Sequence, residues 1–237
     1  MSDEQSTDKP SETIEELEVA IIGAGFAGIC MAIKLREAGL DDFAIFEKSD
    51  GIGGTWHDHT YPGLVCDVPS ILYSFSFELN PNWSHIFSPQ PEIKAYAQSC
   101  VDKHGIGPFI RNNAEVHSAR FDEGTARWHI ELADGRKVCA HVMVSGIGGL
   151  NWSSTPEIDG QDVFQGEQFH TARWPASFDP VGKRIAVVGS AASAIQITPE
   201  IAKTAEQVYV FQRTPNWIFP RPDHEHPPWL KQLFGRM

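Results

Sequence analysis

The segment VAIIGAGFAG, which runs from Val19 to Gly28, decides the fold of the first half of this chain of 237 residues. Its apolar start predicts a buried strand from Glu18 to Ile22, and the G-x-G-x-x-G spacing that follows predicts a turn into a helix. We expect this helix to run from Phe26 to Ala38 and to stop at Gly39. A second apolar strand, Phe43–Phe46, follows. This strand–helix–strand order predicts a parallel sheet with a right-handed crossover.

The glycines of this turn suit a dinucleotide. Gly23 permits the tight turn after the strand, Gly25 lets the backbone approach a pyrophosphate, and Gly28 lets the helix pack against the sheet. The pyrophosphate then lies at the N-terminus of the helix, where N–H groups and the helix dipole favour anions. Glu47 ends the next strand, about 20 residues further on, where a carboxylate accepts hydrogen bonds from ribose hydroxyls. The candidate residues of this first nucleotide site are Gly23, Gly25, Phe26, Gly28, Glu47 and Lys48.

A second strand–helix–strand unit is expected at Arg184–Val188, Ala191–Lys203 and Gln207–Gln212. Its glycine motif is the degenerate run GSAASA, Gly189 to Ala194. Alanine is accepted at the third glycine position, whereas a methyl group at the second position narrows the approach to a pyrophosphate. An arginine, and no acid, follows the second strand, which favours the 2′-phosphate of NADPH over the free ribose of NADH. The candidate residues of this second site are Gly189, Ser190, Ser193, Arg213 and Thr214.

The composition excludes several classes of function. The net charge of −12 argues against a nucleic-acid partner. The cysteines, at positions 30, 66, 100 and 139, form neither a C-x-x-C pair nor a zinc spacing, so we expect free thiols and no metal. The acidic N-terminus lacks an apolar signal region, and the run Val19–Ile22 is too short to span a bilayer. We therefore expect a cytoplasmic protein without a membrane segment.

A long loop and a helix are expected between the two units. The loop runs from Lys48 to about Ser70 and is rich in glycine, proline, histidine and tryptophan. Loops of this length inside a domain are usually functional or mobile. The helix is expected to start at Ser88, with Pro89 just inside it and Gly105 just past its end.

The expected fold class is α/β, with two Rossmann-like, doubly wound, parallel-sheet nucleotide-binding units and a small antiparallel β insertion. The insertion is predicted from three alternating segments, Ala114–Phe121, Arg127–Leu132 and Lys137–Val144. The second unit is expected to be incomplete at the C-terminus, where residues 229–234 suggest only the start of a helix. The expected domains are a disordered leader (1–16), a first nucleotide-binding domain (17–150, insertion about 107–141), a linker (151–182) and a truncated second nucleotide-binding domain for NADPH (183–237).

Two further motifs carry a resemblance to a known family. The linker segment FQGEQFHTARWP, Phe164 to Pro175, follows the pattern F-x-G-x-x-x-H-x-x-x-W-P. The segment GGTWHDHTYPGLVCD, Gly53 to Asp67, matches every fixed position of (A/G)-G-x-W-x4-(F/Y)-P-(G/M)-x3-D. Together with the two glycine loops, these motifs resemble the fingerprints of Baeyer–Villiger monooxygenases, a branch of the flavin-containing monooxygenases. The stretch FQRTP, Phe211 to Pro215, is also similar to this family.

The resemblance implies roles for individual residues. Gly54, Thr55 and Trp56 would lie along the flavin of FAD, and Asp67 would lie near its isoalloxazine ring. Glycine permits close backbone approach to a flat ligand and tryptophan adds an apolar wall, which is compatible with these roles. His170 and Trp174 would couple nicotinamide binding to domain rotation, while a lone histidine is more often a structural hydrogen-bonding residue. The candidate catalytic residues are Asp67, His170 and Trp174.

The implied function is that of an FAD- and NADPH-dependent monooxygenase. NADPH would reduce FAD, O2 would give a C4a-peroxyflavin, and attack on a small-molecule ketone would insert one oxygen atom to give an ester or lactone. Two alternatives stay open: an N- or S-oxygenating relative that acts on amines or sulfides, and a non-catalytic truncated fragment. Full members of the family are about twice this length, and their arginine partner for Asp67 would lie beyond the end of this chain. Neither the substrate nor the oligomeric state can be read from the sequence.

Overall fold

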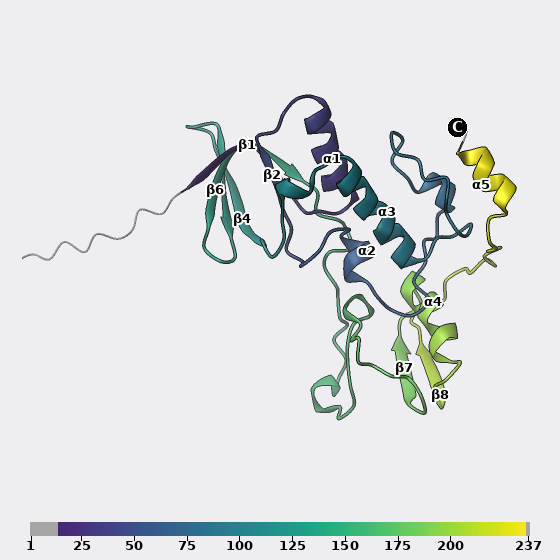
Figure 1. The fold of residues 1–237 in the computed structure, drawn as a ribbon. Coiled ribbons are helices and arrows are strands. Elements are labelled where there is room, and N and C mark those ends of the chain that lie inside the picture. The colour runs from purple at the N-terminus through teal and green to yellow at the C-terminus, as the bar shows by residue number, and fades with distance from the viewer. Residues whose placement is uncertain (1–13, 236–237) are drawn as a thin grey trace, which may run out of the picture. The chain divides into compact units, whose positions relative to one another are not determined.

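The computed structural model describes residues 14–235, and the chain divides into two compact units (Figure 1). The first unit combines Met1–Gly51 with Ile106–Gly146, and the second combines Ile52–Gly105 with Ile147–Met237. Residues 1–13 of the expected leader lie outside the described residues. Within residues 14–235, none of the helices has both the length and the apolar character that crossing a membrane requires.

A six-stranded sheet forms the first unit, with the strand order β3-β2-β1-β6-β5-β4. Its strands are β1 (Glu15–Ile22), β2 (Phe43–Phe46), β3 (Ile110–Arg111), β4 (Val116–Asp122), β5 (Arg127–Leu132) and β6 (Lys137–Ser145). The pairs β3–β2, β2–β1 and β1–β6 are parallel, whereas β6–β5 and β5–β4 are antiparallel. The expected α/β fold with a parallel nucleotide-binding sheet is therefore confirmed.

Two details of this sheet differ from the sequence prediction. The first strand begins at Glu15, not at Glu18, because Glu15 pairs in register with Val138 and its carboxylate forms an ion pair with Arg111. The second difference concerns β6, which was predicted as the last strand of an inserted ribbon but is also a strand of the main sheet. It pairs in parallel with β1 from Val138 to Ser145, so the antiparallel strands extend the nucleotide-binding sheet. Local alternation does not reveal a partner so distant in sequence, and so this pairing was missed.

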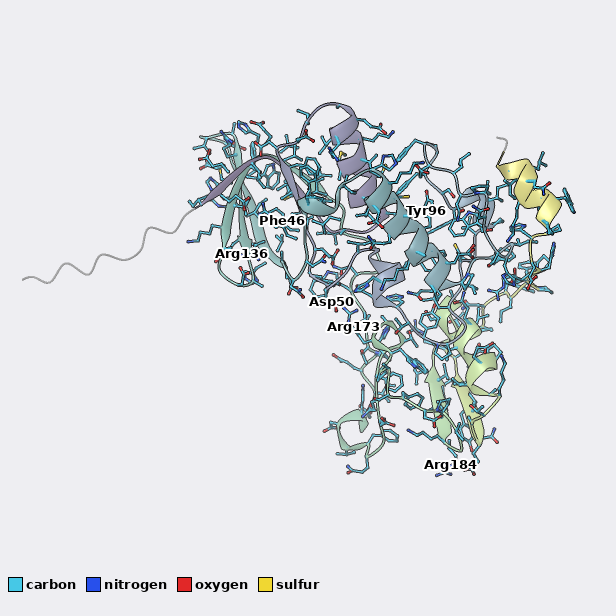
Figure 2. All side chains as sticks on the ribbon, viewed as in Figure 1. Phe46, Asp50, Tyr96, Arg136, Arg173 and Arg184 are labelled. Carbon is cyan, nitrogen blue, oxygen red and sulfur yellow. The ribbon has the colours of Figure 1, made fainter. Side chains whose placement is uncertain are left out.

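The core of the first unit covers both faces of β1, as expected for a central parallel strand. On one face, Ala20 and Ile22 join a buried cluster that includes Phe46, the residue on β2 labelled in Figure 2. On the other face lies α1 (Phe26–Glu37), which packs against β1 and β2. The buried residues of α1 are Gly28, Ile29, Ala32 and Ile33. This packing fixes the start of α1 at the carboxyl edge of the sheet.

The second unit opens with the long loop and two helices, α2 (Thr55–Asp58) and α3 (Gln90–Lys103). Helix α3 starts at Gln90, not at Ser88, so Pro89 lies just outside it as the N-cap and not inside it as predicted. Gly105 lies just past the end of the helix, as predicted, and has a positive φ of 60°. Tyr96, labelled on α3 in Figure 2, donates a hydrogen bond to the Glu78 carbonyl (2.6 Å) and accepts one from the Phe75 N–H (2.8 Å). Burial raises the pKa of Tyr96 far above its usual value. The loop before α3 is thereby held on the helix.

The remainder of the second unit contains the predicted strand–helix–strand motif. Strands β7 (Arg184–Val188) and β8 (Gln207–Phe211) form a parallel pair, and α4 (Ala192–Ile201) connects them. A further helix, α5 (Pro228–Phe234), begins close to the expected position. Single 3₁₀ turns occupy Ser70–Leu72, Gly107–Phe109, Gln161–Val163 and Thr171–Arg173.

The segment before α5 pairs with the segment before α3. The Ile86 N–H donates to the His224 carbonyl (3.1 Å), and the His226 N–H donates to the Ser84 carbonyl (2.8 Å). The His226 ring is buried, with Nε2 3.2 Å from the Ser70 hydroxyl, and this burial lowers the pKa of His226. Segments far apart in the sequence are therefore joined within this unit.

Candidate functional site

The first glycine loop has the conformation that a dinucleotide site requires. Gly23 has a positive φ of 96°, and its N–H donates to the Phe46 carbonyl (2.8 Å). Gly25 is the N-cap of α1, with φ −76° and ψ −174°, and no side chain caps the helix. The first turn carries no acidic residue. The start of the helix thus has the features of an anion-binding site.

Two glycines pack the loop tightly against its surroundings. A Cβ atom on Gly28 would lie 1.9 Å from the Gly23 carbonyl oxygen, so only glycine fits between α1 and the loop. A Cβ atom on Gly146 would lie 2.9 Å from the Ile22 carbonyl oxygen and 3.2 Å from the Gly28 nitrogen. Gly146 was not among the predicted site residues. It follows directly after β6, whose parallel pairing with β1 brings it to the glycine loop, and the sequence alone does not show that pairing.

Glu47 is the buried acid of this site. Its side chain is 5% exposed and lies at the end of β2. One carboxylate oxygen accepts the Ala24 N–H (2.7 Å), and the other accepts the Ser49 N–H (2.8 Å). Each carboxylate oxygen can accept a second hydrogen bond. Glu47 thus fastens the glycine loop and keeps acceptor capacity for ribose hydroxyls.

The signature loop in the second unit begins with two strained glycines. Gly53 has φ 115° and Gly54 has φ 56°, a region that other residues rarely adopt. They lead into α2, where Trp56 is 8% exposed. The Trp56 Nε1–H donates to the Tyr73 hydroxyl (2.8 Å), and the two rings meet edge to face. Burial raises the pKa of Tyr73, and the hydrogen bond from Trp56 opposes this shift. Tyr73 was not predicted as a site residue, because it follows the motif without belonging to it.

Asp67 ends the signature loop and is exposed. It follows Cys66, a buried residue whose N–H donates to the Ser88 carbonyl (2.9 Å). Burial is the main cause that raises the pKa of both Tyr61 and Tyr73, and the negative charge of Asp67 raises both further. Asp67 therefore presents a carboxylate beside two neutral phenols.

The linker fingerprint is held together mainly by its own side chains. The His170 Nδ1 accepts the Ala172 N–H (3.1 Å) and so caps a 3₁₀ turn. Trp174 meets Phe169 and Phe178 edge to face, with ring centroids 5.1 Å and 5.3 Å away. A Cβ atom on Gly166 would lie 2.5 Å from the Phe164 ring. This contact gives a physical reason for the F-x-G spacing.

An ion pair joins the linker to α2. Arg173, labelled in Figure 2, lies 3.9 Å from the Asp58 carboxylate. Burial lowers the pKa of His59; Asp58 opposes this shift, while Arg173 and His170 add to it. The structure therefore brings His170 near the segment Gly53–Asp67. Within residues 14–235, no hydrogen bond, ion pair or ring contact is found between Asp67 and either His170 or Trp174.

The second glycine loop repeats the backbone of the first. Gly189 has φ 115°, its N–H donates to the Phe211 carbonyl (2.8 Å), and Ala191 caps α4 with φ −76° and ψ −178°. The Ser190 hydroxyl donates to the Thr214 carbonyl (3.3 Å), which ties the loop to the segment after β8. Ser193 lies near Tyr61 and opposes the rise in the pKa of Tyr61 that burial causes. Arg213 lies exposed just beyond the end of β8.

Known proteins share both the sequence and the fold of this chain. A family model described as an NAD(P)-binding Rossmann-like domain matches residues 21–98. A Baeyer–Villiger monooxygenase of Pseudomonas aeruginosa is 46% identical over 218 residues, which cover 92% of this chain and 41% of that protein. Cyclohexanone monooxygenase from Rhodococcus sp. Phi1 bound to NADP+ matches with a TM-score of 0.89 at 32% identity, covering 94% of this chain and 43% of the other. OTEMO in complex with FAD and NADP matches with a TM-score of 0.86 at 33% identity, covering 94% and 45%.

Together, the two glycine motifs and these matches show the broad class of protein: the chain is related to flavin-dependent monooxygenases. Within that class it is related by sequence and by fold to the Baeyer–Villiger monooxygenases, and the resemblance that its motifs predict is confirmed. The chain spans about two-fifths of the length of the curated relatives that it matches.

Proposed function

We propose that the chain binds FAD at its first glycine loop and NADPH at its second, as the cofactor-binding part of a ketone monooxygenase. One observation carries this proposal. The chain repeats a strand, an uncapped glycine loop and a helix, and the acid that follows the first repeat is replaced by an exposed arginine after the second. A buried acid suits a ribose and an arginine suits a 2′-phosphate, so the two loops differ as sites for two different dinucleotides would.

At the first site, the chain supplies a positive helix end and a ribose acceptor. The start of α1 has neither a capping side chain nor an acid in its first turn. Glu47 already orients its carboxylate through two backbone N–H groups. In this proposal, α1 receives the pyrophosphate of FAD and Glu47 accepts its ribose hydroxyls. The same residues would hold the cofactor without any large rearrangement of the loop.

At the second site, the chain supplies a second uncapped helix and a cation. Helix α4 has no side-chain cap and no acid in its first turn. Arg213 follows β8 and is exposed, so its guanidinium is free to meet a dianionic phosphate. The proposed preference is therefore for NADPH over NADH. Relatives whose solved structures carry NADP support this assignment.

The proposed reaction is the insertion of one oxygen atom of O2 into a ketone to give an ester or lactone. FAD reduced by NADPH supplies the reactivity toward O2. Trp56 and Tyr73 would form an apolar wall that limits the access of water, and Asp67 would fix a cationic partner beside it. The names of the relatives, Baeyer–Villiger and cyclohexanone monooxygenase, support a ketone as the substrate class.

Flavin binding by the purified chain tests the proposal. The chain is mixed with FAD, freed of excess flavin by gel filtration, and its visible spectrum is recorded. We expect a bound flavin spectrum for the wild type and its loss in Gly25→Val, since a branched side chain would block the pyrophosphate. Gly149→Val is the control, because nothing lies within 4 Å of a Cβ atom there. Far-UV circular dichroism verifies that the variants fold. A wild-type chain that retains no flavin, or a folded Gly25→Val chain that retains it fully, would overturn the proposal.

A further inference from the structure

The side-chain amide of Gln196 joins α4 to the loop Tyr61–Val65. The Tyr61 hydroxyl donates to Gln196 Oε1 (3.1 Å), and the Val65 N–H lies 3.5 Å from the same oxygen. Gln196 Nε2 donates to the Val65 carbonyl (3.0 Å). The oxygen and the nitrogen of the Gln196 amide therefore both have partners, and this one side chain contacts both the N–H and the carbonyl of Val65.

The loop also lies directly on the backbone of α4. Gly63 has φ 77°, and a Cβ atom on it would lie 2.8 Å from the Gln196 carbonyl oxygen and 2.7 Å from Glu200 Cγ. Tyr61 is 6% exposed. Burial raises its pKa, so at neutral pH the phenol keeps the proton that it donates to Gln196. The contact is thus a packed interface of neutral polar groups.

This interface connects two features with different proposed roles. On one side is the start of α4, which follows the second glycine loop. On the other side, the chain runs from Val65 through buried Cys66 to exposed Asp67. The Cys66 N–H is held by the Ser88 carbonyl (2.9 Å), so Gln196 and Ser88 together fix the two residues before Asp67.

We propose that Gln196 is a positioning residue that clamps the Asp67 loop to α4 and transmits dinucleotide binding at the second glycine loop to Asp67. The clamp itself stands on the contacts of this chain, whereas its role in oxygenation rests on the proposed function. The competing interpretation is that Gln196 only stabilises the unit. The two differ in one respect: a purely structural residue would not change how the loop responds to a bound dinucleotide.

Amide hydrogen exchange of the full chain tests the clamp without any cofactor. The comparison is between wild type, Gln196→Ala, and Gln196→Met, which keeps the side-chain volume but removes the hydrogen bonds. Gln207→Ala is the matched control, an exposed glutamine in the same unit. We expect exchange at Val65 to be at least about tenfold faster in both Gln196 variants, with the control unchanged. Exchange at Val65 that is equal in Gln196→Met and wild type would overturn the clamp.

Addition of NADP+ tests the transmission. In the wild type, NADP+ should slow exchange both at 190–196 and at 61–67. In Gln196→Met it should still slow exchange at 190–196 and no longer at 61–67. Slowing at both segments in this variant would make Gln196 merely structural and overturn the proposal. If NADP+ protects neither segment of the wild type, the proposed function and the transmission both fail, while the cofactor-free comparison still decides the clamp.

Discussion

The two glycine loops have nearly the same backbone and very different surroundings. Gly23 and Gly189 share a positive φ, and each donates its N–H to the end of the neighbouring strand at 2.8 Å. Gly25 and Ala191 share a φ of −76° and an extended ψ. Any residue can adopt that conformation, so the backbone does not demand glycine at the second position of the motif. The turn explains the glycine at the first position, whereas at the second position the proposed approach of a pyrophosphate is what would favour glycine.

The surroundings differ in packing and in charge. β1 has a strand on each side, whereas among residues 14–235 the one strand paired with β7 is β8. The third motif position also differs: Gly28 has no room for a methyl group, but Ala194 carries one and is buried. Finally, a buried acid follows β2 and an exposed arginine follows β8. The same local conformation therefore lies in two different surroundings, as the proposal of two different dinucleotides requires.

The largest expected effect comes from exchanging the third motif position. Gly28→Ala places a methyl group 1.9 Å from a backbone oxygen, and we expect it to lower the free energy of unfolding of the first unit by more than about 4 kcal/mol. The reverse change, Ala194→Gly, should cost only about 1 kcal/mol through helix propensity. Amide exchange of β1 and of α4 reports the two units separately. If Gly28→Ala were as stable as the wild type, the first loop would accommodate a methyl group at the third motif position as easily as the second loop does.

Removal of the buried acid should have the next largest effect. Glu47→Ala leaves the N–H groups of Ala24 and Ser49 without their acceptor, which should cost about 2–4 kcal/mol of unfolding free energy. Glu131→Ala, an exposed acid on the same sheet, should change little and serves as control. Urea unfolding, with amide hydrogen exchange at β1 as the probe, measures the unfolding free energy of both variants. A neutral result for Glu47→Ala would mean that the first loop, like the second, needs no acid to hold it.

Sequence patterns predicted the repeated motif well because its signals are local. The extents of β2, α4 and β8 and the start of α1 lie within two residues of the prediction, and Glu47 follows β2 as expected. The pattern could not show that β6 pairs with β1, since that contact joins distant segments. Nor could it show that Tyr73 meets Trp56 or that Gln196 meets Val65, because both depend on how loops fold back. The roles of Asp67, His170 and Trp174 stay predictions.

The charge that follows β8 should decide which dinucleotide binds. Arg213→Ala should weaken the binding of NADPH by about 1.5–3 kcal/mol and leave the binding of NADH nearly unchanged, because only NADPH carries the 2′-phosphate. Arg184→Ala is the control: this arginine, labelled in Figure 2, begins β7 and so lies at the opposite end of the strand pair. Calorimetric titration of the full chain with each cofactor measures the difference. An equal loss for both cofactors would assign Arg213 a structural role.

The smallest effect should come from the second motif position, where the two loops differ by one methyl group. Because Gly25 and Ala191 have the same backbone angles, Ala191→Gly should leave the loop conformation unchanged apart from an entropic cost of about 0.5–1 kcal/mol. Removing the methyl group opens the approach to the pyrophosphate, so NADP+ should bind up to about tenfold more tightly, which corresponds to about 1.4 kcal/mol. The reciprocal change, Gly25→Ala, should weaken the binding of FAD by a similar factor while the chain stays folded. Calorimetric titration of each variant with its own dinucleotide measures both changes. If Ala191→Gly weakens NADP+ instead, the methyl group contacts the ligand favourably, and the second loop is adapted to alanine.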